Sequence, residues 1–181
     1  MANYVIEDQS AAHFMTFRVV DWVDVFSRKI YRDIIINSMK YCQQNKGLEV
    51  YAYVIMTNHV HVIWRASKDN LSDVVRDFKK FTGLNIIKTI QNVETGESRQ
   101  DWLLKRFEFA ARSNIRNSDH QFWASGSHAV ELLSEKFIYQ KLNYIHENPV
   151  RAGWVEKPED YLYSSARNYA NLPALLDIYL I

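Results

Sequence analysis

The chain has 181 residues, 48% of them hydrophobic and 14% aromatic, a composition typical of a globular protein and not of a disordered one. Its 22 Lys and Arg are almost balanced by 21 Asp and Glu, which excludes bulk electrostatic binding of nucleic acid, so any such site must be a local patch. With only 5 Gly and 3 Pro, residues 1–181 are expected to form a single domain. The single cysteine excludes an intramolecular disulfide and fits a reducing cytoplasm. Because the sequence shows no signal peptide and no apolar run long enough to cross a bilayer, no membrane partner is expected.

The first part of the chain predicts a strand, a helix and a hairpin. Apolar and polar residues alternate over 13–20, which indicates a half-buried strand, and a helix is expected over 27–47. Strands are expected over 48–56 and 59–65, and because two residues separate them, they should form an antiparallel hairpin. Five residues of the first hairpin strand are expected to share one face: Leu48, Val50, Ala52, Val54 and Met56.

The second part of the chain predicts mainly helices. One helix is expected over 71–90 and another over about 99–113, followed by a polar loop over 113–121. Residues 122–132 contain short strand-like stretches. A last helix is expected over 134–147, and it should stop at the next proline. The organisation is α+β, an antiparallel sheet with helices packed on one face.

Two histidines stand two residues apart on a predicted strand. His59 and His61 therefore project from the same face of the sheet. Two imidazoles on a rigid strand form half of a site for a divalent metal. Taken alone, the pair fits two ordinary sheet histidines better, because a bare His-x-His pair is frequent.

The last predicted helix carries a tyrosine that is a candidate catalytic residue. Tyr144 and Asn148 are four residues apart and share a helix face. A tyrosine hydroxyl can act as a covalent nucleophile, and a nearby metal assists by polarising phosphoryl oxygens. Taken alone, one of 11 tyrosines fits a packed aromatic better.

These two segments together resemble a known family. Residues 58–63, NHVHVI, resemble the HUH motif, in which two histidines flank a hydrophobic residue. Residues 144–153, YIHENPVRAG, resemble the tyrosine-bearing helix and following turn of the REP-associated tyrosine transposases, relatives of the single-tyrosine transposases of small insertion sequences. The resemblance runs in order over about 13–169 and leaves an apolar tail, 170–181, without a counterpart.

The resemblance implies a fold and a chemistry. It implies a ferredoxin-like antiparallel sheet with the histidines on a central strand. His59 and His61 would bind Mg²⁺ or Mn²⁺, with Asn148 as a third ligand, although the ligand types alone leave zinc open. Tyr144 would attack single-stranded or hairpin DNA, giving a 5′-phosphotyrosine and a free 3′-hydroxyl.

Basic and aromatic residues suggest where DNA lies. Arg76, Lys79 and Lys80 cluster on the 71–90 helix, and Arg151 follows the tyrosine helix. These groups can track phosphates, while Trp123 can stack on an unpaired base. A solvated helix face is an equally good interpretation of any single charge.

Other functions stay open at this point. The chain fits a domesticated endonuclease that processes repeated hairpins, a DNA-binding module that has lost catalysis, or an unrelated metal-dependent hydrolase. The resemblance leaves both a monomer and a homodimer open, and an exposed edge strand near His13 would allow two sheets to pair.

Overall fold

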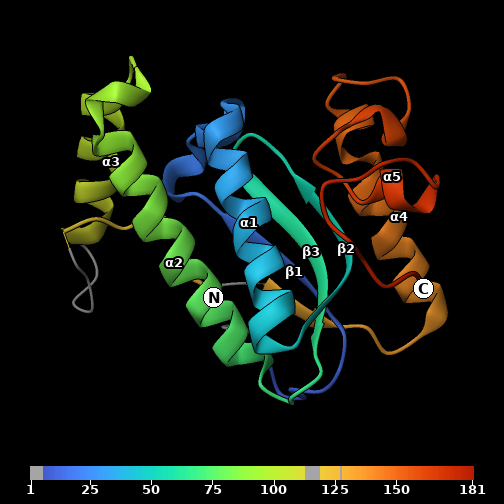
Figure 1. The fold of residues 1–181 in the computed structure, drawn as a ribbon. Coiled ribbons are helices and arrows are strands. Elements are labelled where there is room, and N and C mark those ends of the chain that lie inside the picture. Colours follow the sequence, from blue (N-terminus) through green and yellow to red (C-terminus); the bar gives the residue numbers. More distant parts are fainter. Residues whose placement is uncertain (1–5, 113–118, 127) are drawn as a thin grey trace.

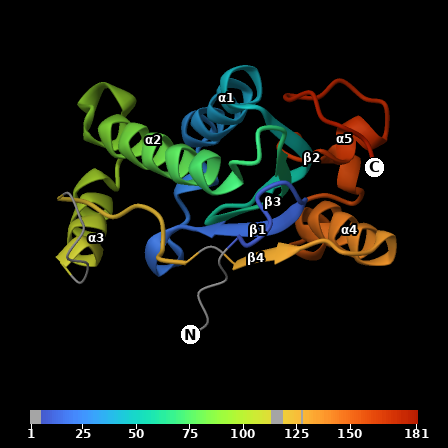
Figure 2. The ribbon, with the colours of Figure 1, turned by 90° about the horizontal axis from the view of Figure 1, so that it is seen from below.

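Four strands form one antiparallel sheet, in the order β2-β3-β1-β4; Figure 1 labels the first three of these, and Figure 2 labels β4 as well. The computed structural model describes residues 6–112, 119–126 and 128–181, so the predicted 113–121 loop lies largely outside the described residues. The strands are β1 (His13–Arg18), β2 (Leu48–Ile55), β3 (His59–Ala66) and β4 (His128–Glu131). The predicted hairpin is β2–β3, and the predicted α+β fold with an antiparallel sheet is confirmed.

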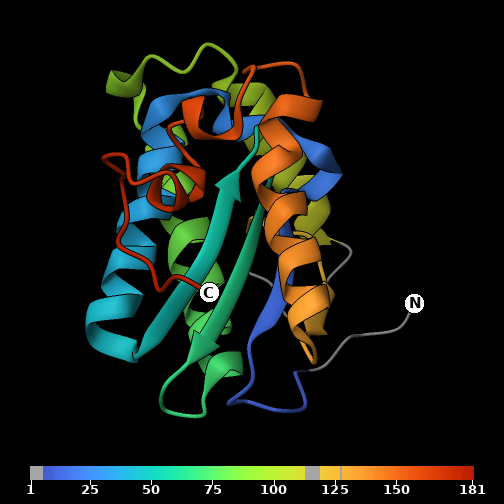
Figure 3. The ribbon, with the colours of Figure 1, turned by 90° about the vertical axis from the view of Figure 1, so that its right-hand side faces the viewer.

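Helices cover both faces of this sheet. They are α1 (Lys29–Lys46), α2 (Leu71–Gln91), α3 (Gln100–Arg112), α4 (Glu135–Arg151) and the short α5 (Ala166–Tyr169). Figures 2 and 3 show α1 and α2 on one side of the strands and α4 on the other. The prediction that helices pack on one face was therefore wrong. The strands are apolar on both faces, as Phe14 and Met15 of β1 illustrate, so each face needs its own cover.

A β-bulge changes which side chains of β2 face α4. The pairing of β2 with β3 shifts register between Val50 and Ala52. Val50 lies in the core beneath α1 and α2, whereas Ala52 and Val54 lie in the core beneath α4. The expectation that five alternating residues share one face was wrong, because the extra residue at the bulge, Tyr51, inverts the alternation.

α4 passes through its proline and ends at Arg151. Pro149 stands in the last turn and is buried, and the Asn148 carbonyl still accepts the Ala152 amide at 3.0 Å. The predicted stop at Pro149 was wrong because the steric bias against helical geometry at the preceding residue is a preference that local packing can overcome.

The C-terminal segment covers the outer edge of β2. Ser164 forms an isolated bridge with Val54, and the Tyr179 amide donates to the Val50 carbonyl at 2.9 Å. Leu176 is buried in the core beneath α1 and α2. The apolar tail thus pairs with backbone groups that an edge strand would otherwise leave open.

The strand near His13 is not an edge strand. β1 lies between β3 and β4, so the expected route to dimerisation through it was wrong. A homodimer stays a prediction. None of the helices within the described ranges combines the length and apolar character needed to cross a membrane.

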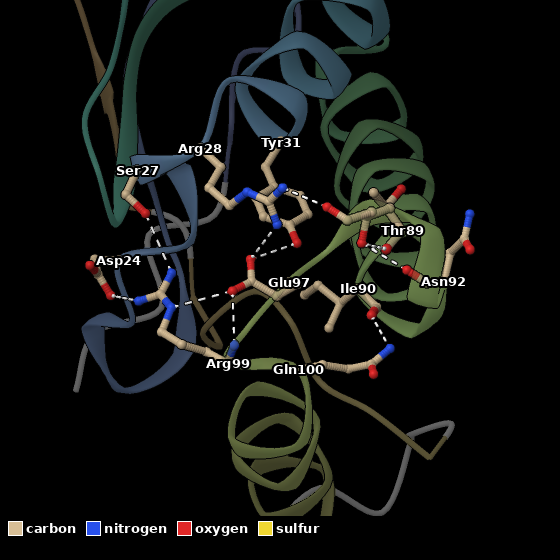
Figure 4. Close-up of polar contacts among 11 residues, drawn as sticks. Asp24, Ser27, Arg28, Tyr31, Thr89, Ile90, Asn92, Glu97, Arg99 and Gln100 are labelled. Carbon is tan, nitrogen blue, oxygen red and sulfur yellow. Dashed lines mark hydrogen bonds and ion pairs between the residues drawn. The ribbon is translucent and has the colours of Figure 1, made fainter.

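A buried carboxylate joins the start of α1 to the connection between α2 and α3 (Figure 4). Glu97 accepts hydrogen bonds from Arg28 at 3.1 Å, from the Tyr31 hydroxyl at 3.0 Å and from the Arg99 amide at 3.1 Å. Arg99 also pairs with Asp24 at 2.8 Å. Burial raises the pKa of the Glu97 carboxyl, but the hydrogen bonds from Arg99, Arg28 and Tyr31 outweigh it and hold that pKa below its usual value.

Removal of this carboxylate should destabilise the fold. A Glu97→Ala variant is expected to lose about 2–3 kcal/mol of unfolding free energy, because Arg28 and Tyr31 lose a buried partner. Urea denaturation measures the loss, with the exposed Glu94→Ala as control. Because the folded-state pKa is lowered, the contribution is complete above the ordinary value of 4.5 and fades as the pH falls through the lower folded value. Equal losses in the two variants at pH 7 would contradict this role.

Candidate active site

The histidine pair lies on an inner strand, on the face that α4 covers. His59 and His61 are on β3, and their ring centroids are 4.6 Å apart. The β1–β3 register sets Thr16 beside His61 and Arg18 beside His59. Their strand neighbours Val60 and Val62 point into the other core, so the period of two fixes both imidazoles on one face.

Each imidazole is oriented by a neighbouring side chain. His59 Nδ1 lies 2.6 Å from Asn58 Oδ1, and because that oxygen only accepts, Nδ1 carries the proton and Nε2 carries the lone pair. His61 Nδ1 lies 2.8 Å from Thr16 Oγ1. Such contacts orient metal-binding histidines in other proteins.

Both imidazoles are neutral at physiological pH. Burial lowers the pKa of His59 to about 4. Burial, together with the nearby His59 and Lys141, lowers the pKa of His61 to about 3. Neutral imidazole is the form that coordinates a metal.

Tyr144 reaches this pair from α4. Its ring centroid lies 5.2 Å from that of His61 and 6.0 Å from that of Phe14, in edge-on contacts. The side chain remains 36% exposed. Two cations flank the ring, with Arg151 Cζ 5.2 Å and Lys141 Nζ 5.9 Å from the centroid. The tyrosine is therefore accessible and surrounded by positive charge.

Asn148 lies one turn after Tyr144 on α4. Its Nδ2 donates to the Tyr144 carbonyl at 2.7 Å, which leaves Oδ1 for another partner. Within the described residues no hydrogen bond joins Asn148 to either histidine.

The donors present fit a small metal site. No cluster of three or more His, Cys, Asp or Glu able to hold a metal exists within residues 6–112, 119–126 and 128–181. Two imidazoles on neighbouring rings can supply part of a coordination sphere, which substrate oxygens can complete. An incomplete protein ligand set of this kind suits a metal that also binds phosphate.

The cations predicted on the 71–90 helix do not join this site. Arg76, Lys79 and Lys80 are on α2, across the sheet from α4. Arg76 pairs with Asp73 and Asp77. Burial and the charge of Arg18, in that order, lower the pKa of Lys79 to about 8.

Trp123 and Arg151, which were also predicted to bind DNA, lie in different environments. Trp123 is only 7% exposed, and its indole N–H donates to Thr82 Oγ1 at 3.0 Å, so it packs in the core. Arg151 lies beside Tyr144, as described above. Of the five residues predicted to contact DNA, only Arg151 lies against the tyrosine.

The sequence interpretation missed three residues of the site. They are Thr16, Asn58 and Lys141, each in contact with a histidine or with Tyr144. Lys141 precedes Tyr144 by three residues, a spacing that places both on one helix face and could have identified it.

The site brings two neutral imidazoles together with an accessible tyrosine that is flanked by cations. Metal-assisted phosphoryl transfer uses groups of these kinds. The class of protein is set by the comparisons with known proteins. The family model "Transposase IS200 like" matches residues 9–107, more than half of the chain. The chain therefore belongs to the IS200-like transposase family, whose general activity is DNA cleavage and transfer.

A solved structure agrees with the fold. The chain is similar to a REP-associated tyrosine transposase bound to a REP hairpin, with a TM-score of 0.63 and 18% identity, over 99% of this chain and 92% of that one. A Deinococcus radiodurans protein assigned as a transposase gives a TM-score of 0.46 and 14% identity, over 80% and 95%. No curated protein sequence matches the chain. The predicted family resemblance is confirmed.

Proposed function

We propose that the protein cleaves and rejoins single-stranded or hairpin DNA through a 5′-phosphotyrosine on Tyr144. His59 and His61, with Asn148, would hold Mg²⁺ or Mn²⁺. The observation that carries the proposal is the approach of the exposed Tyr144 ring to within 5.2 Å of the buried His61 ring.

The chemistry balances with the residues present. A bond forms between the Tyr144 hydroxyl oxygen and the scissile phosphorus, and the bond from phosphorus to the 3′ oxygen breaks. The phenolic proton leaves to solvent, which reaches the 36% exposed side chain, and the departing 3′ oxygen gains a proton. When bound, a divalent ion supplies a Lewis acid that polarises the phosphoryl oxygens. Rejoining is the same exchange in reverse.

Lys141 is a candidate for binding the scissile phosphate. Its Nζ lies over the rings of Phe14 at 4.7 Å and Phe137 at 5.2 Å, as well as near Tyr144. Within the described residues no carboxylate pairs with it, so its charge is available to an anion.

A Lys141→Met variant is therefore expected to form the covalent adduct about ten- to a hundredfold more slowly, because it loses charge stabilisation of the transition state. Single-turnover rates measure the effect. Lys136→Met, on the exposed first turn of the same helix, is the control. Equal rates for the two variants would contradict a role for Lys141 in phosphate binding.

Hairpin DNA is the substrate class that the comparisons support, because a similar solved structure is of a transposase bound to a REP hairpin. The test uses labelled hairpin oligonucleotides from the flanks of the protein's own gene, incubated with Mg²⁺ or Mn²⁺. Denaturing gels should then reveal a metal-dependent covalent protein–DNA adduct. Hairpin binding without any adduct across several metals would instead favour a non-catalytic DNA-binding protein.

A further inference from the structure

An exposed tryptophan lies beside the histidine pair, on the side away from Tyr144. The Trp22 ring centroid is 5.8 Å from that of His59, in an edge-on contact. The guanidinium carbon of Arg18 is 5.1 Å from the same ring. Despite these contacts, 52% of Trp22 is exposed. A large aromatic surface therefore remains open to a ligand next to the candidate metal ligands.

The backbone that presents Trp22 is unusual. Asp21 and Trp22 have φ values of 52° and 55°, in the left-handed region that L side chains rarely adopt. The Trp22 amide donates to the Val19 carbonyl at 3.2 Å. Two consecutive left-handed residues persist only where surrounding contacts hold them, and such outliers gather at functional sites.

The same segment is attached to the residue that orients His59. The Trp22 carbonyl accepts from Asn58 Nδ2 at 3.2 Å, and Asn58 Oδ1 accepts from His59 Nδ1 at 2.6 Å. The Asn58 carbonyl in turn accepts the Val19 amide at 2.9 Å. The backbone of Trp22 is thus tied to the residue that orients His59, while the side chain is exposed.

We propose that Trp22 stacks on an unpaired nucleobase beside the scissile phosphate, a proposal that rests on the proposed function. Every base offers a π-face, and stacking on an aromatic side chain is a general means of holding single-stranded DNA. Arg18 supplies a cation beside the ring for the adjoining phosphate. Ring contacts run from Trp22 through His59 and His61 to Tyr144, so the base lies at one end of this row and the nucleophile at the other.

Binding experiments test this role in a Tyr144→Phe background with Mg²⁺, where no cleavage interferes. The probes are a fluorescein-labelled hairpin from the flanks of the gene with a single-stranded extension, and the same hairpin cut flush. Trp22→Ala is expected to weaken binding of the extended hairpin about tenfold, the order that one stacked base contributes, and to leave flush-hairpin binding unchanged. Trp22→Phe should retain most of the affinity.

Two controls separate stacking from folding. Tyr41→Ala removes a side chain that is 56% exposed on α1, across the sheet, and should bind both probes like the parent. Trp22→Gly suits the left-handed backbone, so it should keep the parent's circular dichroism spectrum and bind like Trp22→Ala. Parental affinity of Trp22→Ala for the extended hairpin would overturn the proposal.

The test of base stacking by Trp22 can also be distinguished from the test of the cleavage chemistry. A wild-type protein that forms no adduct, together with weakened extended-hairpin binding by Trp22→Ala, would support base stacking and overturn the nucleophile. Adduct formation by wild type with unchanged binding by Trp22→Ala would overturn base stacking and support the nucleophile. Failure to bind either hairpin would overturn both.

Discussion

A His61→Ala variant is expected to lose metal-dependent cleavage of hairpin DNA by at least about a hundredfold, the loss expected when Lewis-acid stabilisation of several kcal/mol is removed. His61 is buried and contacts Thr16, His59 and Tyr144, and the substitution removes one of the two proposed imidazole ligands. The proposed site would then retain only one imidazole. Single-turnover cleavage rates across Mn²⁺ concentrations measure the effect on the reaction, and calorimetric titration with Mn²⁺ measures the loss of binding directly.

The control for His61 is another buried histidine in the sheet. His13→Ala removes a ring whose Nδ1 contacts the Ala11 carbonyl at 3.0 Å and which, among the described residues, makes no ring contact with the site. This variant is expected to lose stability but to keep the dependence of cleavage on metal. If His61→Ala retained wild-type Mn²⁺ affinity, the histidine pair would not be the metal site.

A Tyr144→Phe variant is expected to form no detectable covalent adduct, a loss of about 10⁴-fold or more, since it removes the proposed nucleophile. Phenylalanine keeps the ring contacts with His61 and Phe14, so the fold and the hairpin affinity should stay close to wild type. Denaturing gels report the adduct, and fluorescence anisotropy reports binding to the same labelled hairpin.

Tyr139→Phe is the matched control on the same helix. Tyr139 lies on α4 and is 52% exposed, but within the part of the chain that the structure describes it makes no ring contact with either histidine. Its loss of a hydroxyl should leave adduct formation unchanged. Adduct formation by Tyr144→Phe at the wild-type rate would rule out Tyr144 as the nucleophile.

Local patterns were enough to predict the elements that build the site. The period of two around His59 and His61 correctly predicted two side chains on one sheet face, because alternation is a property of the strand itself. The short link expected between the two strands likewise predicted the hairpin, although the link between β2 and β3 has three residues, 56–58. The i,i+4 relation of Tyr144 and Asn148 holds because α4 continues through both.

The errors concern relations between elements. Alternation cannot reveal the bulge beside Val50, because the residues on both sides of it are apolar or aromatic and suit either face of the sheet. Helical spacing showed that Arg76 and Lys80 share a face, but not that α2 packs across the sheet from Tyr144. No partner for the apolar tail could be predicted from the sequence, because that partner, the edge of β2, is more than a hundred residues away.

The most direct measurement is the mass of the peptide that carries the DNA. Trypsin cuts after Lys141 and Arg151, so Tyr144 falls in the peptide Leu142–Arg151, which contains no other tyrosine and no serine or threonine. Wild-type protein is incubated with the hairpin and Mn²⁺, and the adduct is digested with nuclease and trypsin before mass spectrometry. The expected result is a nucleotide linked through phosphate to Tyr144 in this peptide. A nucleotide found on any other peptide, with Leu142–Arg151 unmodified, would contradict it.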